Sequence, residues 1–360
     1  MPDRATFEIL SGRDGLEILR PDWTALQRDC AGAAFYTDWR WHWAVARHLA
    51  PEPLHYVCLR RADRLIGILP LQARILSHGI LSIPALAFPT HDHIELSDML
   101  VPREEATPGV FEALLSFLDR EMGIPWHCLH LRGLAEGAGL LATASGCRAR
   151  IDHQRGNAFF KTRDGSPLPV PAKLLRNISR LRNRAEKEFG AVSTTSSRNG
   201  EGLTAAFEAF LDIEASGWKG EGGAGTAIRH TPALVSFYRD LLDGFAADGS
   251  IAINLLWFHD RPAAGQFCIK AGGTWSILKI GYEDAFRSFG PGSILLQWFI
   301  EECTTDATTG EVNLVTAPDW ARRWHALTRK VYTITGYRET FQGRALKVAH
   351  AVYRNIMNPG

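Results

Sequence analysis

Residues 275–302 read WSILKIGYEDAFRSFGPGSILLQWFIEE, and this stretch decides the fold of the second half of the chain. It reads as a strand, a short loop and an apolar helix. The loop carries the spacing Arg287-x-x-Gly290-x-Gly292, and Ser293 follows at the helix start. Small residues let a backbone approach phosphates closely, and the free N–H groups of a first helical turn attract anions. The order predicts a phosphate-binding turn, with a plain strand–turn–helix connection as the alternative.

This spacing at the start of a helix resembles the acyl-CoA pyrophosphate loop of the GNAT acyltransferase superfamily. The wider sequence is similar to the acetyltransferase group linked to bacterial cellulose and exopolysaccharide synthesis, which is related to the Fem-type peptidyl transferases. The residues that carry this second resemblance are Ile213-Glu214, Trp218-Lys219-Gly220, Gly225-Thr226-Ala227-Ile228, Gly281-Tyr282 and Pro291-Gly292. It covers nearly the whole chain and is specific from about Lys173 onward. Residues 319–324, DWARRW, depart from it, because such proteins often carry a lysine shortly before a tryptophan near the end.

The composition limits the class of protein. At 360 residues the chain can form two domains, and a formal net charge of +1 disfavours nucleic acid as a dominant partner. No run approaches the roughly 18–20 apolar residues of a membrane span, and the polar start lacks an export signal. The six cysteines include no Cys-x-x-Cys pair. We expect a cytoplasmic protein without membrane insertion and without a bound metal.

A long-range repeat predicts two related halves. Residues 54–71 and 251–269 each read as a hairpin of apolar strands. In both halves a further strand (92–101 and 274–282), a helix after Pro-Gly and another strand (127–133 and 311–315) follow. We expect a mixed α/β (α+β) fold of two tandem GNAT-like domains. The predicted bounds are 1–150 for the first domain, 151–172 for a linker and strand, and 173–360 for the acyl-CoA-binding domain.

The two halves differ in the loop before the repeated helix. Residues 101–111 read VPREEATPGVF, without the Arg-x-x-Gly-x-Gly spacing, and Glu104 and Glu105 would repel phosphates. The first domain is therefore predicted to be degenerate, with cofactor binding in the second half alone.

The resemblance implies acetyl-CoA as co-substrate and assigns roles around the loop. In GNAT folds, backbone N–H groups on the preceding strand polarise the acyl carbonyl, which implies Ile280 and Gly281 here. Tyr282, at the strand end, is a candidate proton donor to the departing thiolate, and simple packing at a strand end is the alternative. The residues that would bind the pyrophosphate are Arg287, Gly290, Gly292 and Ser293.

Acyl transfer to an amine also needs a base, for which Glu214 is the candidate. Helical spacing over 202–217 puts its carboxylate on a mostly buried side, where desolvation would raise its pKa. Lys219 is a further candidate catalytic residue, and a structural pair between Glu214 and Lys219 is the alternative. Residues 219–225, KGEGGAG, have the glycine content of a mobile lid or of a flexible connection.

Two groups of residues, a pair of histidines and a pair of arginines, are candidates for binding the acceptor. His91 and His93 flank one residue, and a metal site is the weaker alternative because further ligands are lacking. On the helix over 173–189, Arg176 and Arg180 belong to a basic face that could contact an anionic substrate. A solvated face of an ordinary helix is the alternative there.

The leading hypothesis is an acyl-CoA-dependent N-acyltransferase that moves an acyl group, in the first instance acetyl, to a small-molecule amine. By resemblance, that amine is an amino sugar or nucleotide sugar used in exopolysaccharide or cellulose production. One alternative is an aminoacyl-tRNA-dependent transferase of the Fem type, for which the basic helix would contact RNA. Another is a non-catalytic binding module of polysaccharide synthesis.

Overall fold

The computed structural model describes residues 5–78, 81–147, 149–163, 170–216 and 225–357. It divides into two compact units, each described by itself below. Unit 1 comprises Met1–Arg155 together with Lys330–Gly360, and unit 2 comprises Gly156–Arg329. Residues from Lys330 onward, which the sequence-based bounds place in the second domain, thus pack with unit 1. Among the described residues, no helix has both the length and the apolar character needed to cross a bilayer.

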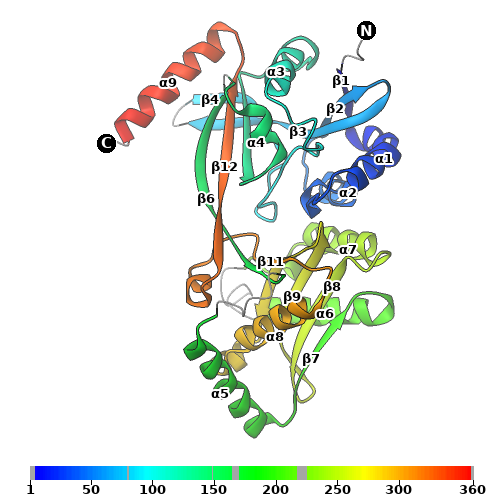
Figure 1. The fold of residues 1–360 in the computed structure, drawn as a ribbon, viewed down its shortest axis with the longest axis vertical. Coiled ribbons are helices and arrows are strands. Elements are labelled where there is room, and N and C mark those ends of the chain that lie inside the picture. The colour runs from blue at the N-terminus through cyan, green and yellow to red at the C-terminus, as the bar shows by residue number, and fades with distance from the viewer. Residues whose placement is uncertain (1–4, 79–80, 148, 164–169, 217–224, 358–360) are drawn as a thin grey trace. The chain divides into compact units, whose positions relative to one another are not determined.

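Unit 1 is a mixed sheet with helices on it (Figure 1). Its strands follow the order β1-β2-β3-β4-β5-β12-β6, in which β2, β3 and β4 are antiparallel and β5 is parallel to β4. The elements of this unit are β1 (Thr6–Ser11), α1 (Gly12–Asp29), η1 (Phe35–Thr37), α2 (Trp39–His48), β2 (His55–Arg61), β3 (Arg64–His78), β4 (Leu81–Ala87), α3 (Val110–Glu121), β5 (Cys128–Ala135), α4 (Gly139–Ala144), β6 (Ala149–Lys161), β12 (Leu327–Tyr337) and α9 (Phe341–Met357).

The predicted strand over 92–101 is wrong. The third strand of this half is β4, whose apolar run 81–87 pairs with β3 along its whole length. Residues 92–101 form a loop that contributes a single β-bridge, between Leu100 and Ile68. The Asp98 carboxylate fixes this loop by accepting hydrogen bonds from the N–H groups of Gly139 and Leu140. Burial raises the pKa of the Asp98 carboxyl to about 6, against the lowering effect of these bonds.

Unit 2 repeats the same order of elements. The antiparallel strands β8, β9 and β10 are followed by a helix and by β11, which is parallel to β10. The last residues of β6 pair with β11, and β7 pairs with β8. The elements are α5 (Ala172–Phe189), β7 (Val192–Ser197), α6 (Gly200–Ser216), η2 (Ile228–His230), α7 (Pro232–Ala246), β8 (Ile251–Phe258), β9 (Arg261–Ala271), β10 (Thr274–Tyr282), η3 (Asp284–Phe289), α8 (Pro291–Thr305), β11 (Glu311–Asn313) and η4 (Asp319–Trp324).

Alternate residues of β9 face two different helices, as the period of a strand requires. Phe267 faces α6, where its ring meets Phe207 at 6.0 Å between centroids. Ala264 and Cys268 face the other way, into the core that α8 covers. The sheet of unit 2 is therefore buried on both faces, and the predicted mixed α/β fold with a repeated order of elements is confirmed.

Candidate active site

Strands β10 and β11 pair over only three residues and then separate. The pairs are Thr274 with Glu311, Trp275 with Val312, and Ser276 with Asn313. Beyond them, the register of β10 against β9 shifts between Ile277 and Lys279. Such a bulge re-aims backbone groups and increases the local twist. Beyond Ser276, no described residue of β10 pairs with β11, so an opening separates the two strands.

A strained turn follows β11, at the point where the two strands separate. The Thr316 N–H donates to the Leu314 carbonyl at 2.6 Å, which closes a three-residue γ-turn. The central residue, Val315, has φ = 63°, which a β-branched residue rarely adopts. The Asn313 side chain supports the turn, because its Oδ1 accepts from the Val315 N–H at 2.7 Å. Asn313 is itself held by two side-chain hydrogen bonds with Asn157, at 2.8 and 3.0 Å.

The loop after β10 presents the start of α8 to this opening. Gly290 is the N-cap residue with φ = 62°, a conformation that glycine adopts without a steric penalty. Pro291 follows at the first helical turn, where a missing N–H costs nothing. The Gly290 carbonyl accepts from the N–H groups of Ser293 and Ile294. No side chain caps the helix, so the Gly292 N–H is left as a donor for a ligand.

Helix α5 supports this loop from behind. Arg184 donates to the Ser288 carbonyl at 2.6 Å, and its guanidinium lies 4.2 Å from the centroid of the Phe289 ring. A Cβ on Gly290 would lie 3.0 Å from Leu181 Cδ1, so α5 and the loop are in close contact. Arg184, which belongs to the basic face of α5, therefore stabilises this loop. Arg176 and Arg180 are exposed on this helix, and Arg180 donates to Asn177 Oδ1 at 3.0 Å.

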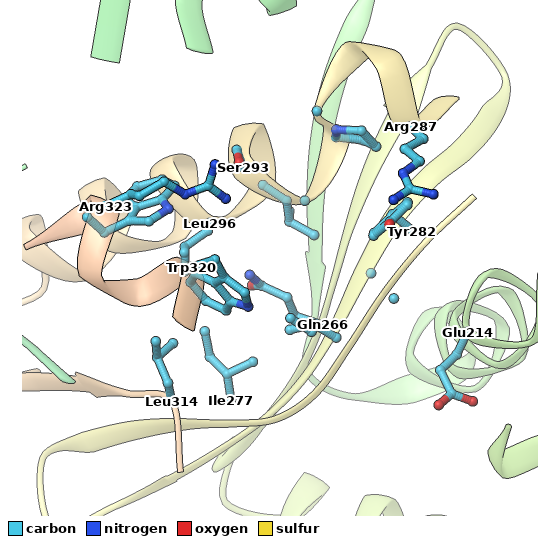
Figure 2. A pocket seen from close by; sticks show the side chains of 18 residues that line it. Glu214, Gln266, Ile277, Tyr282, Arg287, Ser293, Leu296, Leu314, Trp320 and Arg323 are labelled. Atoms are coloured by element: carbon cyan, nitrogen blue, oxygen red, sulfur yellow. The ribbon is translucent and has the colours of Figure 1, made fainter. Parts of the chain in front are cut away.

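The opening between β10 and β11 is a cavity of about 560 Å³ within unit 2 (Figure 2). One wall is apolar, and the start of α8 forms the other. Arg287 and Arg323 both line it, and neither has an ion-pair partner among the described residues. The residues that line the cavity are Glu214, Gly265, Gln266, Ile277, Ile280, Gly281, Tyr282, Arg287, Gly290, Pro291, Gly292, Ser293, Leu295, Leu296, Leu314, Trp320, Arg323 and Trp324.

Most of the predicted site residues come together in this one cavity. All six residues predicted for the cofactor line it, together with Tyr282 and Glu214. Lys219 and most of the predicted lid over 219–225 lie outside the described residues. Arg176 and Arg180 do not line this cavity, and His91 lines a separate cavity in unit 1. His91 and His93 lie in a loop, where the His93 N–H donates to His91 Nδ1 at 3.2 Å.

Glu214 and Tyr282 lie on different sides of Gly281. A Cβ on Gly281 would lie 3.0 Å from Glu214 Cα, so the missing side chain lets α6 approach β10. The Tyr282 ring lies toward α8, because a Cβ on Gly292 would be 3.9 Å from its Cδ1. In Figure 2 the Glu214 carboxylate points away from Tyr282 and Arg287. Glu214 is 3% exposed, and its Oε2 accepts from the Ile228 N–H at 2.8 Å.

Several cavity residues escaped the sequence analysis. Gln266 is 2% exposed, and its side chain extends toward Trp320 in Figure 2. Asn254 Nδ2 donates to Gln266 Oε1 at 3.3 Å, which orients the amide. The sequence signal for Gln266 is its position as a polar residue inside the apolar run of β9, because a buried polar side chain needs a hydrogen-bond partner. The two arginines of residues 319–324 differ in environment. Arg323 lines the cavity, whereas Arg322 is exposed and pairs with Asp319 at 3.5 Å.

The comparisons with known proteins agree with this fold. Residues 172–320 match the family model described as an acetyltransferase (GNAT) domain. FemX has 11% identity and a TM-score of 0.54, over 87% of this chain and 95% of that one. L-PGS from Bacillus licheniformis has 12% identity and a TM-score of 0.56, over 92% of this chain and 96% of that one. No curated protein matches the chain. The chain contains a GNAT acetyltransferase-fold domain, as predicted.

Among the described residues, no group of three or more His, Cys, Asp or Glu side chains is placed to hold a metal ion.

Proposed function

We propose that the protein is an acyl-CoA-dependent N-acyltransferase, with acetyl-CoA as donor, whose donor site is the cavity of unit 2. The observation that carries this proposal is the start of α8, where a helix N-terminus without a side-chain cap and Arg287, which has no ion-pair partner among the described residues, meet at an apolar cavity. An acyl-CoA needs both features, because its diphosphate is anionic and its thioester arm is largely apolar. The family match over 172–320 supports the same class of reaction.

In the proposed reaction the amine nitrogen attacks the acyl carbon, a C–N bond forms and the C–S bond breaks. Backbone N–H groups at Ile280 and Gly281 stabilise the negative charge on the acyl oxygen. Glu214 accepts the proton of the amine, and Tyr282 gives a proton to the thiolate. The arrangement around Gly281 supports these roles. The amine and the thiolate are different substituents of the tetrahedral intermediate, so one group must accept a proton and another must donate one, and Glu214 and Tyr282 lie on different sides of Gly281.

For the acceptor we propose a small amine, with an amino sugar or nucleotide sugar of exopolysaccharide or cellulose production as the specific case. Only the sequence resemblance around Glu214 and Gly281-Tyr282 supports that specific case. His91, His93, Arg176 and Arg180 remain proposed acceptor contacts, and the reaction is proposed to take place in the cytoplasm. The fold likeness to FemX and L-PGS favours one other candidate, a transferase that takes its acyl group from an aminoacyl-tRNA.

A melting experiment separates the two donors. A ligand that binds only the folded state raises stability by about 2.7 kcal/mol at 100 times its dissociation constant. We expect acetyl-CoA to raise the melting temperature of the full chain and to give an acetylated product with an amino-sugar panel. A rise with aminoacyl-tRNA and none with acetyl-CoA would overturn the proposal in favour of the Fem-type reaction. No rise with either would leave a non-catalytic module as the better account.

A further inference from the structure

A second cavity, of about 440 Å³, lies within unit 1, and His91 is the one residue of its lining that also has a role in the proposed acyl transfer. Its lining comes from β3, from the loop after β4, and from β5 and β6. This volume is within the range of pockets that hold metabolite-sized ligands. Unlike the cavity of unit 2, it is lined by many charged and polar side chains, including three arginines and two histidines.

A set of hydrogen bonds holds the loop after β4 against the neighbouring strands. Arg155 donates to the Glu95 carbonyl at 2.6 Å and pairs with the Glu95 carboxylate at 2.9 Å. The Ser97 N–H donates to the Gly133 carbonyl at 3.1 Å, and the Gly133 N–H donates to Gln154 Oε1 at 3.2 Å. These bonds join the loop, β5 and β6. The cavity is therefore bounded by groups that the protein itself keeps in place.

Positive charge inside the cavity is not balanced by the protein. Arg74, Arg132 and Arg155 line it together with the carboxylates of Asp92 and Glu95. Arg155 is paired with Glu95, whereas Arg74 and Arg132 have no ion-pair partner among the described residues. Burial lowers the pKa of Arg155, Glu95 opposes this, and the nearby charge of Arg132 lowers it further. Arg132 is thus close enough to Arg155 for their like charges to repel.

We propose that this cavity binds a small organic ligand through a phosphate or carboxylate group, with Arg132 as the main contact and Arg74 as the second. A guanidinium donates two parallel hydrogen bonds to either group, so these anions share the required geometry. An anion here relieves the repulsion between Arg132 and Arg155. Thr90 contributes a buried hydroxyl that has no hydrogen-bond partner within the part of the chain that the structure describes. Asp92 also lines the cavity and has no ion-pair partner among the described residues, so we expect the part of the ligand next to Asp92 to be neutral or positively charged.

Titration calorimetry of the full-length protein with inorganic phosphate and with malonate tests this proposal. The background variant Arg287→Ala removes the main anion contact of unit 2, so the result is independent of the proposed acyl transfer. We expect one anion to bind per chain, and a preference for phosphate or for malonate identifies the group. Arg132→Gln should weaken binding at least tenfold. Asp92→Asn should strengthen it, because it removes the opposing charge.

Arg103→Gln is the matched control, since Arg103 is an exposed arginine of unit 1 that does not line the cavity. It should change the affinity by less than twofold. Absence of binding by both anions would overturn the proposal. Equal losses in Arg132→Gln and Arg103→Gln would also overturn it, because they would show a general effect of net charge.

Discussion

Replacing Arg287 by alanine should weaken acetyl-CoA binding without disturbing the fold. Arg287 is exposed, lines the cavity of unit 2 and has no ion-pair partner among the described residues. Its removal therefore leaves no buried group unsatisfied. A hydrogen bond to a charged group contributes about 1.5–3 kcal/mol. Because solvent screens an exposed arginine, the lower end applies, and about 1.5 kcal/mol corresponds to about a tenfold loss of affinity.

The assay is titration calorimetry with two donors, acetyl-CoA and acetyl-pantetheine, which lacks the diphosphate. Arg287→Ala should weaken acetyl-CoA by about tenfold and leave acetyl-pantetheine within twofold. The control is Arg322→Ala, which removes the same charge from an exposed arginine that does not line the cavity. Arg322→Ala should change neither affinity by more than twofold. If Arg287→Ala weakened both donors equally, or neither, the diphosphate would not bind at the start of α8.

Three further predictions concern the surroundings of this site. Glu214→Gln should leave acetyl-CoA binding intact and lower the rate of transfer by about 10²–10⁴-fold. Glu201→Gln, on the same helix, is the control and should leave the rate unchanged. A normal rate in Glu214→Gln would show that another group is the base. Gly281→Ala puts a Cβ 3.0 Å from Glu214 Cα and should lower the free energy of unfolding by about 1–3 kcal/mol in urea titrations. Gly202→Ala, with nothing within 4 Å, is its control and should not destabilise. Gln266→Leu removes the oxygen acceptor of Asn254 Nδ2 and leaves it only the weak acceptor Cys268 Sγ, so it should cost about 1–3 kcal/mol. Much of this loss should be restored by Asn254→Leu in the double variant, and an additive loss would contradict the pairing.

Local patterns predicted the parts of the fold that depend on neighbours in sequence. The connection between β10 and α8 is local, since a strand, Gly290, Pro291 and an apolar helix follow one another directly. The helices predicted over 173–189 and 202–217 are observed at Ala172–Phe189 and Gly200–Ser216. In each case hydrophobic periodicity and nearby glycines carry the information.

Features that depend on distant partners were not predictable in the same way. Residues 81–87 pair with β3, and residues 85–87 also pair with β5, which begins only at Cys128, so this second pairing has no signal in the local sequence. Proline is uncommon inside strands, and Pro84 lies in the middle of β4, where its carbonyl accepts from the His127 N–H at 2.8 Å. No local signal shows that Lys330–Gly360 returns to unit 1. Gln266 and Arg323 likewise meet in one cavity only through the tertiary fold.

The central claim is that the cavity of unit 2 is the acyl-CoA site, and a crystal structure of the full-length protein with acetyl-CoA tests it most directly. The account predicts one acetyl-CoA per chain, with the diphosphate over the N–H groups at Gly292 and Ser293 and within reach of Arg287. The thioester oxygen should lie within hydrogen-bond distance of a backbone N–H at Ile280 or Gly281. Acetyl-CoA bound in the cavity of unit 1, or with its diphosphate away from the start of α8, would contradict the account.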